Sequence, residues 1–178
     1  MCYTYRMSYQ YKNFYNKNAE FYNTRPTAKK LLIVGNKILT YGFAVAYLGL
    51  WLYGIILGSF TVQDYAKIFF VPLLTLVVVS VMRLAVSRPR PYSPQGAAIS
   101  PLTTPSKKAD DSFPSRHLAC AAAIAVTILC YSYLFGSFAL TLCGVLAYMR
   151  FALGLHYPSD LFVGVGVGAT IGALIFIL

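Results

Sequence analysis

The residues best suited to covalent chemistry in this sequence are His156 and Asp160, which lie four positions apart. Pro158 lies between them and is expected to begin a helix, because a proline at the first helical position loses no hydrogen bond. Asp160 then lies in the first turn and can reach back to the imidazole. A carboxylate bonded to one ring nitrogen fixes the tautomer and leaves the other nitrogen as a nucleophile or base. The alternative is an Asp that only caps the helix beside an uninvolved His.

The second histidine follows a proline in a similar way. Pro114 is expected to begin a helix whose first turn contains Ser115, Arg116 and His117. Backbone N–H groups in a first turn are unsatisfied and the helix dipole is positive there, which makes a ready anion site. A Ser hydroxyl, an Arg and a His in that turn can all bind phosphate. Ordinary helix capping in a surface loop is the alternative.

Three further arginines border apolar sequence. Arg83 lies near the end of one apolar run, Arg90 lies in the run Arg-Pro-Arg-Pro at 88–91, and Arg150 precedes His156 by six positions. Guanidinium groups bind phosphate oxygens through paired planar donors and stay charged. The other explanation is that basic residues only orient membrane spans. It fits Arg83 and Arg150 poorly and fits four lysines well: Lys29, Lys30, Lys107 and Lys108.

The composition indicates what kind of scaffold must position these side chains. Of the 178 residues, 58% are hydrophobic and 11% are charged, whereas a soluble domain carries about 25% charged residues. A water-soluble globule and a disordered chain are both excluded. The net charge of +10 would suggest nucleic acid in a soluble protein. Here the basic residues flank apolar runs, so lipid headgroups and phosphate are the expected partners, and nucleic acid is not.

Five apolar stretches qualify or nearly qualify as membrane spans, each of which needs roughly 20 residues. We therefore predict an all-α integral membrane bundle of about five transmembrane helices, forming a single domain over residues 31–178. If the spans alternate in direction, six polar residues converge on one membrane face: Arg83, Arg90, His117, Arg150, His156 and Asp160. Small residues in the third and fifth stretches allow close helix contact. The stretches are residues 38–57 with a lead-in at 31–34, then 66–86, 114–134, 138–151 and 158–178.

Residues 1–30 form a polar segment in which Tyr and Phe alternate with Lys and Arg. It differs from a secretory signal peptide because no apolar core or small-residue cleavage site follows the basic start. Basic segments rich in aromatic residues are typical of the headgroup level of a membrane. We therefore predict an interfacial segment here, and a disordered tail is the alternative.

Three blocks of the sequence resemble the signature of the type 2 phosphatidic acid phosphatase superfamily, whose fold and site are shared with acid phosphatases and vanadium haloperoxidases. The family pattern is K-x6-R-P, P-S-G-H and S-R-x5-H-x3-D. This chain reads R-x6-R-P over 83–91, P-S-R-H over 114–117 and M-R-x5-H-x3-D over 149–160, in the same order and spacing. It departs from the pattern where Arg83 replaces Lys, Arg116 replaces Gly and Met149 replaces Ser.

The resemblance implies a two-step phosphoryl transfer. His156 would attack phosphorus to form a phosphohistidine, with Asp160 orienting it, and His117 would protonate the leaving oxygen and then activate water. No metal or other cofactor is implied, and the five acidic residues show no carboxylate cluster suited to magnesium. The residues expected to hold the phosphoryl oxygens are Arg83, Arg90, Ser115, Arg116 and Arg150.

The function implied is a membrane lipid phosphatase acting on a phosphate or diphosphate monoester. Substrates of this type include phosphatidic acid, phosphatidylglycerol phosphate and undecaprenyl diphosphate. A non-catalytic phospholipid-binding or transport bundle and a phosphotransferase on the same fold are the alternatives. The expected location is the plasma membrane. The positive-inside rule favours a cytoplasmic site, whereas lipid phosphatases of this family usually face outward, and we expect the extracytoplasmic side.

Overall fold

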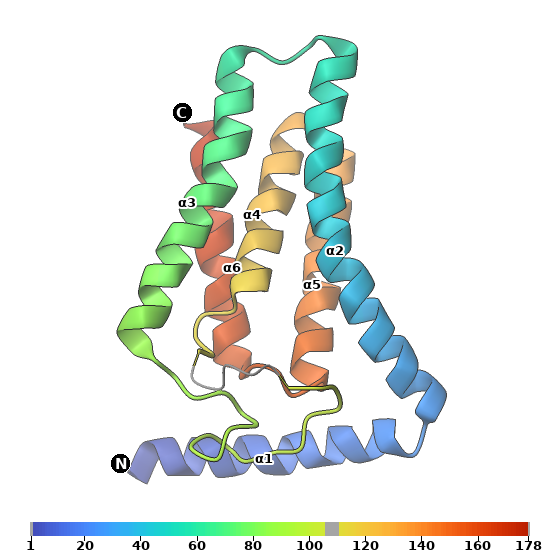
Figure 1. Cartoon of the computed structure of the whole chain (residues 1–178), viewed down its shortest axis with the longest axis vertical. Helices are drawn as coiled ribbons and strands as arrows, with labels where there is room; N and C mark the ends of the chain where they lie inside the picture. The colour runs from blue at the N-terminus through green and yellow to red at the C-terminus, as the bar shows by residue number, and fades with distance from the viewer. Residues whose placement is uncertain (1, 106–110, 178) are drawn as a thin grey trace.

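The computed structural model describes the chain except for residues 1, 106–110 and 178, and for residues 2–10 it describes the backbone alone. The described residues form helices and loops without any strand. In Figure 1, α2 to α6 run side by side as a bundle and α1 lies across one end. The elements are α1 (Cys2–Asn23), α2 (Pro26–Leu57), α3 (Val62–Val86), α4 (Arg116–Tyr131), α5 (Tyr133–Ala152), α6 (Pro158–Ala173) and the short 3₁₀ helix η1 (Leu174–Phe176).

Four helical segments of the bundle are long and apolar enough to cross a membrane: α2, α3, α5, and α6 continued by η1. The remaining helix, α4, is apolar but has only 16 residues, fewer than the roughly 20 that span a bilayer core. The prediction of an all-α integral membrane bundle is confirmed, and four helical segments are long enough to cross a membrane where the sequence predicted about five transmembrane helices. The chain is an integral, multi-pass membrane protein.

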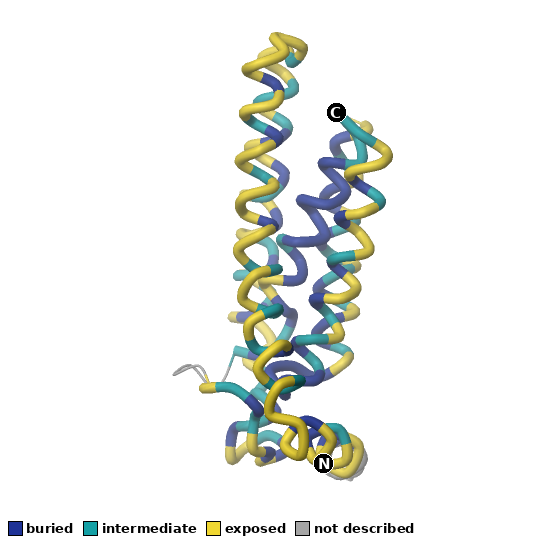
Figure 2. Tube along the Cα trace, turned by 90° about the vertical axis from the view of Figure 1, so that its right-hand side faces the viewer, coloured by how far each residue is buried: buried dark blue, intermediate teal, exposed yellow. Residues whose placement is uncertain are grey.

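The short helix α4 forms the centre of the bundle. Its alanines at 119, 122 and 125 are fully buried, and Figure 2 shows buried residues gathered inside the bundle and exposed ones along its outer surface. Gly168 of α6 lies so close to α4 that a Cβ there would overlap the Ala119 carbonyl. Small residues therefore allow the backbones of α4 and α6 to touch, as the sequence predicts.

The start of α2 differs from the sequence prediction. The helix begins at Pro26, not near residue 38, because Asn36 and Lys37 lower the hydropathy without interrupting the helical backbone. Its 32 residues correspond to about 48 Å at 1.5 Å per residue. This length exceeds the roughly 30 Å hydrocarbon core, so part of α2 extends beyond it.

The predicted third span, residues 114–134, is also corrected. Its helix begins at Arg116, two residues after Pro114, and ends at Tyr131. Ser132 has an extended backbone, and its hydroxyl accepts a hydrogen bond from the Phe135 N–H at 3.5 Å, so it ends α4 and caps α5. This capping serine explains why α5 begins at Tyr133, five residues earlier than the hydropathy predicts.

One end of the bundle is covered by α1 and by the long connection between α3 and α4 (Figure 1). The Tyr15 hydroxyl donates to the Ser100 carbonyl of that connection at 3.1 Å. Gly154, in the loop after α5, has a φ of 75° and lies against the Tyr15 ring, so both its backbone and the close approach favour a residue without Cβ. The buried face of α1 consists of Tyr11, Tyr15, Ala19 and Tyr22.

Candidate functional site

The residues singled out in the sequence converge at this covered end of the bundle. The carboxyl-terminal ends of α3 and α5 and the amino-terminal ends of α4 and α6 lie there together (Figure 1). His117 lies within electrostatic range of Arg90, Arg116, Arg150 and His156. The alternation of helix directions expected from the sequence therefore brings four distant segments to one place.

The first of the two histidines, His156, is almost completely buried, with 1% of its surface exposed. Its Nδ1 lies 3.0 Å from the Ser112 carbonyl oxygen and 3.7 Å from Asp160 Oδ2. Because a carbonyl can only accept, Nδ1 carries the proton and Nε2 carries the lone pair. The carboxylate lies beside the ring, but the direct hydrogen-bond partner of the ring is the Ser112 carbonyl.

The charge state of His156 follows from its surroundings. Burial lowers the pKa of His156 from 6.5 to about 4, and this effect outweighs the neighbouring Asp160, which favours the charged form. The imidazole is therefore neutral at pH 7. A neutral ring with a fixed tautomer has the properties required of a nucleophile.

The carboxylate of Asp160 is fully buried and bonded on both oxygens. Its Oδ1 accepts from Arg88 Nη1 at 2.7 Å, and its Oδ2 accepts from the Tyr157 N–H at 3.0 Å and from the Ser112 hydroxyl. The Arg88 guanidinium also lies 4.3 Å from the centre of the Tyr157 ring. Asp160 thus caps α6 and also lies next to His156. The sequence offered a helix cap and a partner of the histidine as alternatives for Asp160, and the structure combines both.

The contacts that Ser112 and Arg88 make with Asp160 were not predicted from the sequence. Ser112 acts through its carbonyl as well as its hydroxyl, and backbone contacts leave no signal in side-chain type. Arg88 is 72 positions from Asp160. Its signal is its place beside Arg90 in a proline-rich run, which favours extended backbone.

The start of α4 holds the second histidine in a different way. Ser115 is the N-cap residue, but its hydroxyl makes no capping bond and is buried without a hydrogen-bond partner among the described residues. The Ser115 N–H donates to the Asp160 carbonyl at 3.0 Å, which joins the starts of α4 and α6. Arg116 and His117 follow in the first turn and are exposed. Simple capping therefore does not explain the Ser115 side chain.

Of the remaining arginines, Arg83 and Arg150 are buried, with 6% and 5% of their surfaces exposed. Arg83 donates to the carbonyls of Asp111 and Pro114 and so holds the loop before α4. Arg150 Nη2 donates to the Thr40 hydroxyl at 3.0 Å. The Nε atoms of Arg90 and Arg150 have no hydrogen-bond partner among the described residues.

Positive charge dominates this end of the bundle. Arg88 forms a salt bridge with Asp160, whereas none of the described salt bridges involves Arg83, Arg90, Arg116 or Arg150. An unpaired buried charge is costly, and guanidinium donors fit phosphate oxygens. The site is therefore suited to bind an anion with several oxygens.

Two features next to Arg150 concern α2 and α5. Thr40 is a polar residue in an apolar helix, four positions after Asn36, whose backbone carbonyl accepts a hydrogen bond from the Thr40 hydroxyl at 2.7 Å. Polar residues repeated on one face of a membrane helix often mark function, a signal that could have found Thr40.

Met149, at the family's Ser position, lies against Gly35, where a Cβ would come within 2.9 Å of the Met149 methyl group. In place of a hydroxyl, Met149 supplies packing between α5 and α2.

Metal-ligating side chains do not cluster in the described part of the chain. Across the described part of the chain, no three His, Cys, Asp or Glu residues gather in a group that could hold a metal ion.

Comparison with known proteins gives two kinds of match in sequence. Residues 64–178 match the model of a family described as the PAP2 superfamily. The chain is also similar to decaprenylphosphoryl-5-phosphoribose phosphatase from two strains of Mycobacterium tuberculosis, with 38% identity over 99 residues. This match covers 56% of this chain and 51% of each relative, so the chain spans about half the length of the curated relatives it matches.

Among solved structures, the chain resembles the crystal structure of Aquifex aeolicus LpxE. The TM-score is 0.58 at 24% identity, over 84% of this chain and 94% of that chain. This likeness is one of fold.

Proposed function

Because this chain belongs to the PAP2 superfamily, we propose that it is a membrane lipid phosphatase that hydrolyses a phosphate or diphosphate monoester of a lipid. One observation carries the proposal. Buried donors of Arg90, Arg150 and Ser115 without partners among the described residues lie on the segments that surround a buried, neutral His156. Such an arrangement holds an anion beside a nucleophile.

In the first step, His156 Nε2 attacks phosphorus and the bond from phosphorus to the leaving oxygen breaks. The product is a phosphohistidine, as in the family generally. The Ser112 carbonyl accepts a hydrogen bond from the Nδ1 N–H throughout this step and so keeps Nε2 as the attacking atom. Asp160, 3.7 Å from Nδ1, stabilises the positive charge that develops on the ring.

The leaving oxygen requires a proton, and His117 is the group proposed to supply it. Its exposed position at the start of α4 suits exchange with a leaving alcohol or phosphate and then with water. In the second step His117 takes a proton from water, the water oxygen attacks phosphorus, and the bond from phosphorus to Nε2 breaks. Phosphate is released and His156 regains its lone pair.

The phosphoryl oxygens are proposed to bind Arg83, Arg90, Ser115, Arg116 and Arg150. Fixed positive charge at the site stabilises the charge of the transition state without reorganisation. Neither step involves a metal or other cofactor. Arg83 differs from the others because two of its donors hold carbonyls of the 111–114 loop, so it positions Ser115 as well as adding charge.

The lipid class and the location belong to the same proposal. The curated relatives are named for a phosphatase of a decaprenyl-linked phosphoribose, which favours a polyprenyl-linked phosphate over a glycerolipid here. We place the chain in the plasma membrane with residues 1–30 at the headgroup level and the site on the extracytoplasmic side. Labelling a Thr104→Cys variant with a membrane-impermeant maleimide in intact cells tests that side, since Thr104 is exposed in the site-covering connection.

The decisive experiment measures phosphate release by the purified, detergent-solubilised protein. The panel contains phosphatidic acid, phosphatidylglycerol phosphate, undecaprenyl diphosphate and a polyprenyl-linked sugar phosphate, each with and without EDTA. We expect release from at least one lipid, unaffected by EDTA and absent in a folded His156→Ala variant. Release that survives in that variant contradicts the proposed mechanism, and loss with EDTA that magnesium restores contradicts the metal-free reaction.

The same panel separates the alternatives. Tight vanadate binding without hydrolysis of any lipid would favour a non-catalytic phospholipid-binding bundle. Transfer of phosphate to an added alcohol in preference to water would favour a phosphotransferase.

A further inference from the structure

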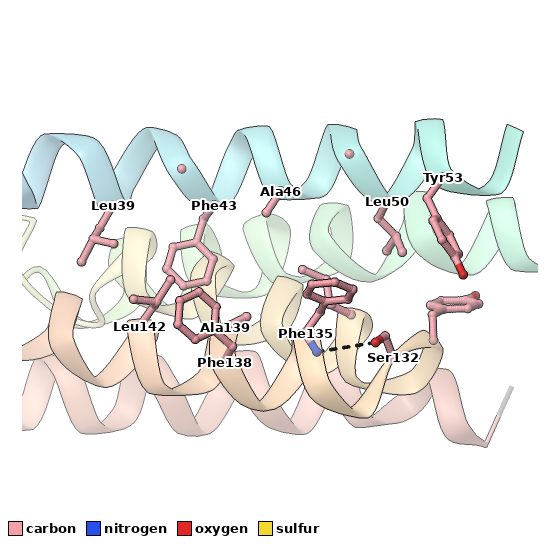
Figure 3. A pocket seen from close by; sticks show the side chains of 14 residues that line it. Leu39, Phe43, Ala46, Leu50, Tyr53, Ser132, Phe135, Phe138, Ala139 and Leu142 are labelled. Carbon is pink, nitrogen blue, oxygen red and sulfur yellow. Dashed lines mark hydrogen bonds between the residues drawn. The ribbon is translucent and has the colours of Figure 1, made fainter. Parts of the chain in front are cut away.

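A cavity lies between α2, α4 and α5. Its volume is about 440 Å³, within the range of roughly 300–1,000 Å³ typical of ligand pockets. Figure 3 shows Leu39, Phe43 and Leu50 of α2 facing Phe135, Phe138 and Leu142 of α5 across it. We call this cavity the α2/α5 groove.

The lining of the α2/α5 groove suits hydrocarbon alone. Its side-chain hydroxyls are those of Tyr53, Tyr131 and Ser132. Tyr53 and Ser132 lie at the end remote from Leu39 (Figure 3), and Tyr131 directly precedes Ser132 in the chain. Two of them are already bonded: Tyr131 donates to the Asp64 carboxylate at 3.2 Å, and Ser132 caps α5. The rest of the lining offers apolar side chains and glycines, so a charged or strongly polar ligand would find no partner.

The near end of the α2/α5 groove adjoins the arginine site. Leu39 lines the groove, and the next residue, Thr40, accepts the hydrogen bond from Arg150 Nη2 at 3.0 Å. From Leu39 to Tyr53 the groove follows α2 for fourteen positions, which is about 21 Å at 1.5 Å per residue. This length is greater than half of the roughly 30 Å hydrocarbon core. A hydrocarbon chain in the groove would start beside the arginine site and would extend over a length greater than half of that core.

We propose that the α2/α5 groove binds the hydrocarbon chain of the lipid phosphate, and that it selects one long chain. This inference rests on the proposed function, because a phosphate at Arg150 is what brings a chain to the near end. Gly42 and Gly49 widen the α2 wall, since a Cβ at either position would meet no atom within 4 Å. Two other occupants of the α2/α5 groove are compared with this one. Bulk membrane lipid covers a helix surface without any cavity, and a second copy of the protein would need a protruding apolar surface to fill the groove.

The two glycines provide the test, because a leucine at either position fills the groove without straining the helix. Leucine is also a better helix former than glycine, so these variants are expected to fold. Gly144→Leu and Gly166→Leu are the matched controls. Both positions are exposed in a helix, a Cβ at either would meet no atom within 4 Å, and neither lines the groove.

The measurement compares turnover of butyl phosphate with turnover of farnesyl and undecaprenyl phosphates. We expect Gly42→Leu and Gly49→Leu to lose at least about tenfold on the long chains, because several methylene groups lose their buried contacts. Turnover of butyl phosphate should match wild type, and the two control variants should be unchanged on every substrate. Equal losses on short and long chains, or no loss on either, would overturn the proposal.

A second readout is independent of hydrolysis. A long-chain alkyl phosphate with a photoreactive diazirine midway along the chain is crosslinked to the His156→Ala protein, and the labelled peptides are identified by mass spectrometry. Labelling of α2 and α5, reduced by adding Gly42→Leu, supports the groove even if wild type releases no phosphate from any lipid. Labelling of α2 and α5 that is unchanged by Gly42→Leu overturns the proposal. A change of oligomeric state in Gly49→Leu without any effect on chain-length preference would identify a protein interface and also overturn the proposal.

Discussion

The two histidines lie at the amino-terminal ends of neighbouring helices, yet their surroundings are opposite. His156 is 1% exposed and its Nδ1 is bonded to the Ser112 carbonyl. His117 lies in the exposed first turn of α4. The segment before α6 is held by the carboxylate of Asp160, whereas the segment before α4 ends in a Ser115 hydroxyl without a partner among the described residues.

This difference separates two chemical tasks. A nucleophile that forms a covalent bond needs one tautomer, one orientation and no proton on the attacking atom, and burial beside fixed acceptors provides all three. A group that gives a proton to a leaving oxygen and then takes one from water needs access to both, and exposure provides it. Each prediction below changes one side of this comparison.

The largest effect is expected from the two histidines themselves. His156→Ala should lower kcat by about 10⁶-fold, the scale seen when a covalent nucleophile is removed. His117→Ala should cost about 10²- to 10⁴-fold, the usual contribution of a general acid or base. With p-nitrophenyl phosphate, whose leaving group needs no proton, His117→Ala should accumulate phosphoenzyme, which acid-quench trapping detects. Phosphoenzyme in His156→Ala would reverse the assignment.

Asp160→Asn should lower kcat by at least about 10²-fold. The comparable loss is about 10⁴ where the carboxylate bonds the histidine directly, and here the direct bond is to the Ser112 carbonyl. KM should change little, because Asp160 has no proposed contact with phosphate. Steady-state kinetics measures both terms, and a rise in KM without loss of kcat would place Asp160 in substrate binding instead.

The pH profile reports the buried side of the comparison. Catalysis requires neutral His156, whose pKa is about 4, so kcat/KM should fall about tenfold per unit below pH 4. The imidazole binds a proton more readily in the unfolded chain, where its pKa is 6.5, than in the folded protein. His156 therefore makes the free energy of unfolding decrease as the pH falls from 6.5 to about 4. A limb of kcat/KM with a midpoint near pH 6.5, the ordinary value for histidine, would contradict the lowered pKa of His156.

Arg88→Ala should cost about tenfold in kcat, because one charge-assisted hydrogen bond to Asp160 is lost. Arg88→Lys should recover part of the activity, since an ammonium can still reach the carboxylate. Arg25→Ala is the matched control, because Arg25 is exposed and lies over the Phe21 ring away from the site. Full activity in Arg88→Ala would show that Ser112 and the Tyr157 N–H suffice to hold Asp160.

The smallest effect is expected where α1 touches the site. The Tyr11 hydroxyl donates to the His156 carbonyl at 3.4 Å, and Tyr11→Phe removes this long hydrogen bond while keeping the ring. Activity should stay within about threefold of wild type. Tyr41→Phe, at an exposed position of α2, provides the baseline. A loss as large as that of Arg88→Ala would make α1 part of the machinery that orients His156.

Much of the site could be predicted from local sequence. His156 and Asp160 are close because four positions at a helix start bring two side chains together, and no distant contact is required. The direct partner of the imidazole was missed because it is a backbone carbonyl, which every residue possesses. The start of α4 was misplaced by two residues because Pro114 is also suited to the loop before an N-cap.

By itself, the sequence determined the membrane character, the helices, the order of the three blocks and the family. These properties depend on hydropathy and on spacings of a few residues, which helix geometry converts directly into distances. The tertiary structure alone decided that Arg88 meets Asp160, that Thr40 meets Arg150 across 110 positions, and that a groove runs between α2 and α5. Such contacts follow from how whole helices pack, and packing depends on every side chain in the interface.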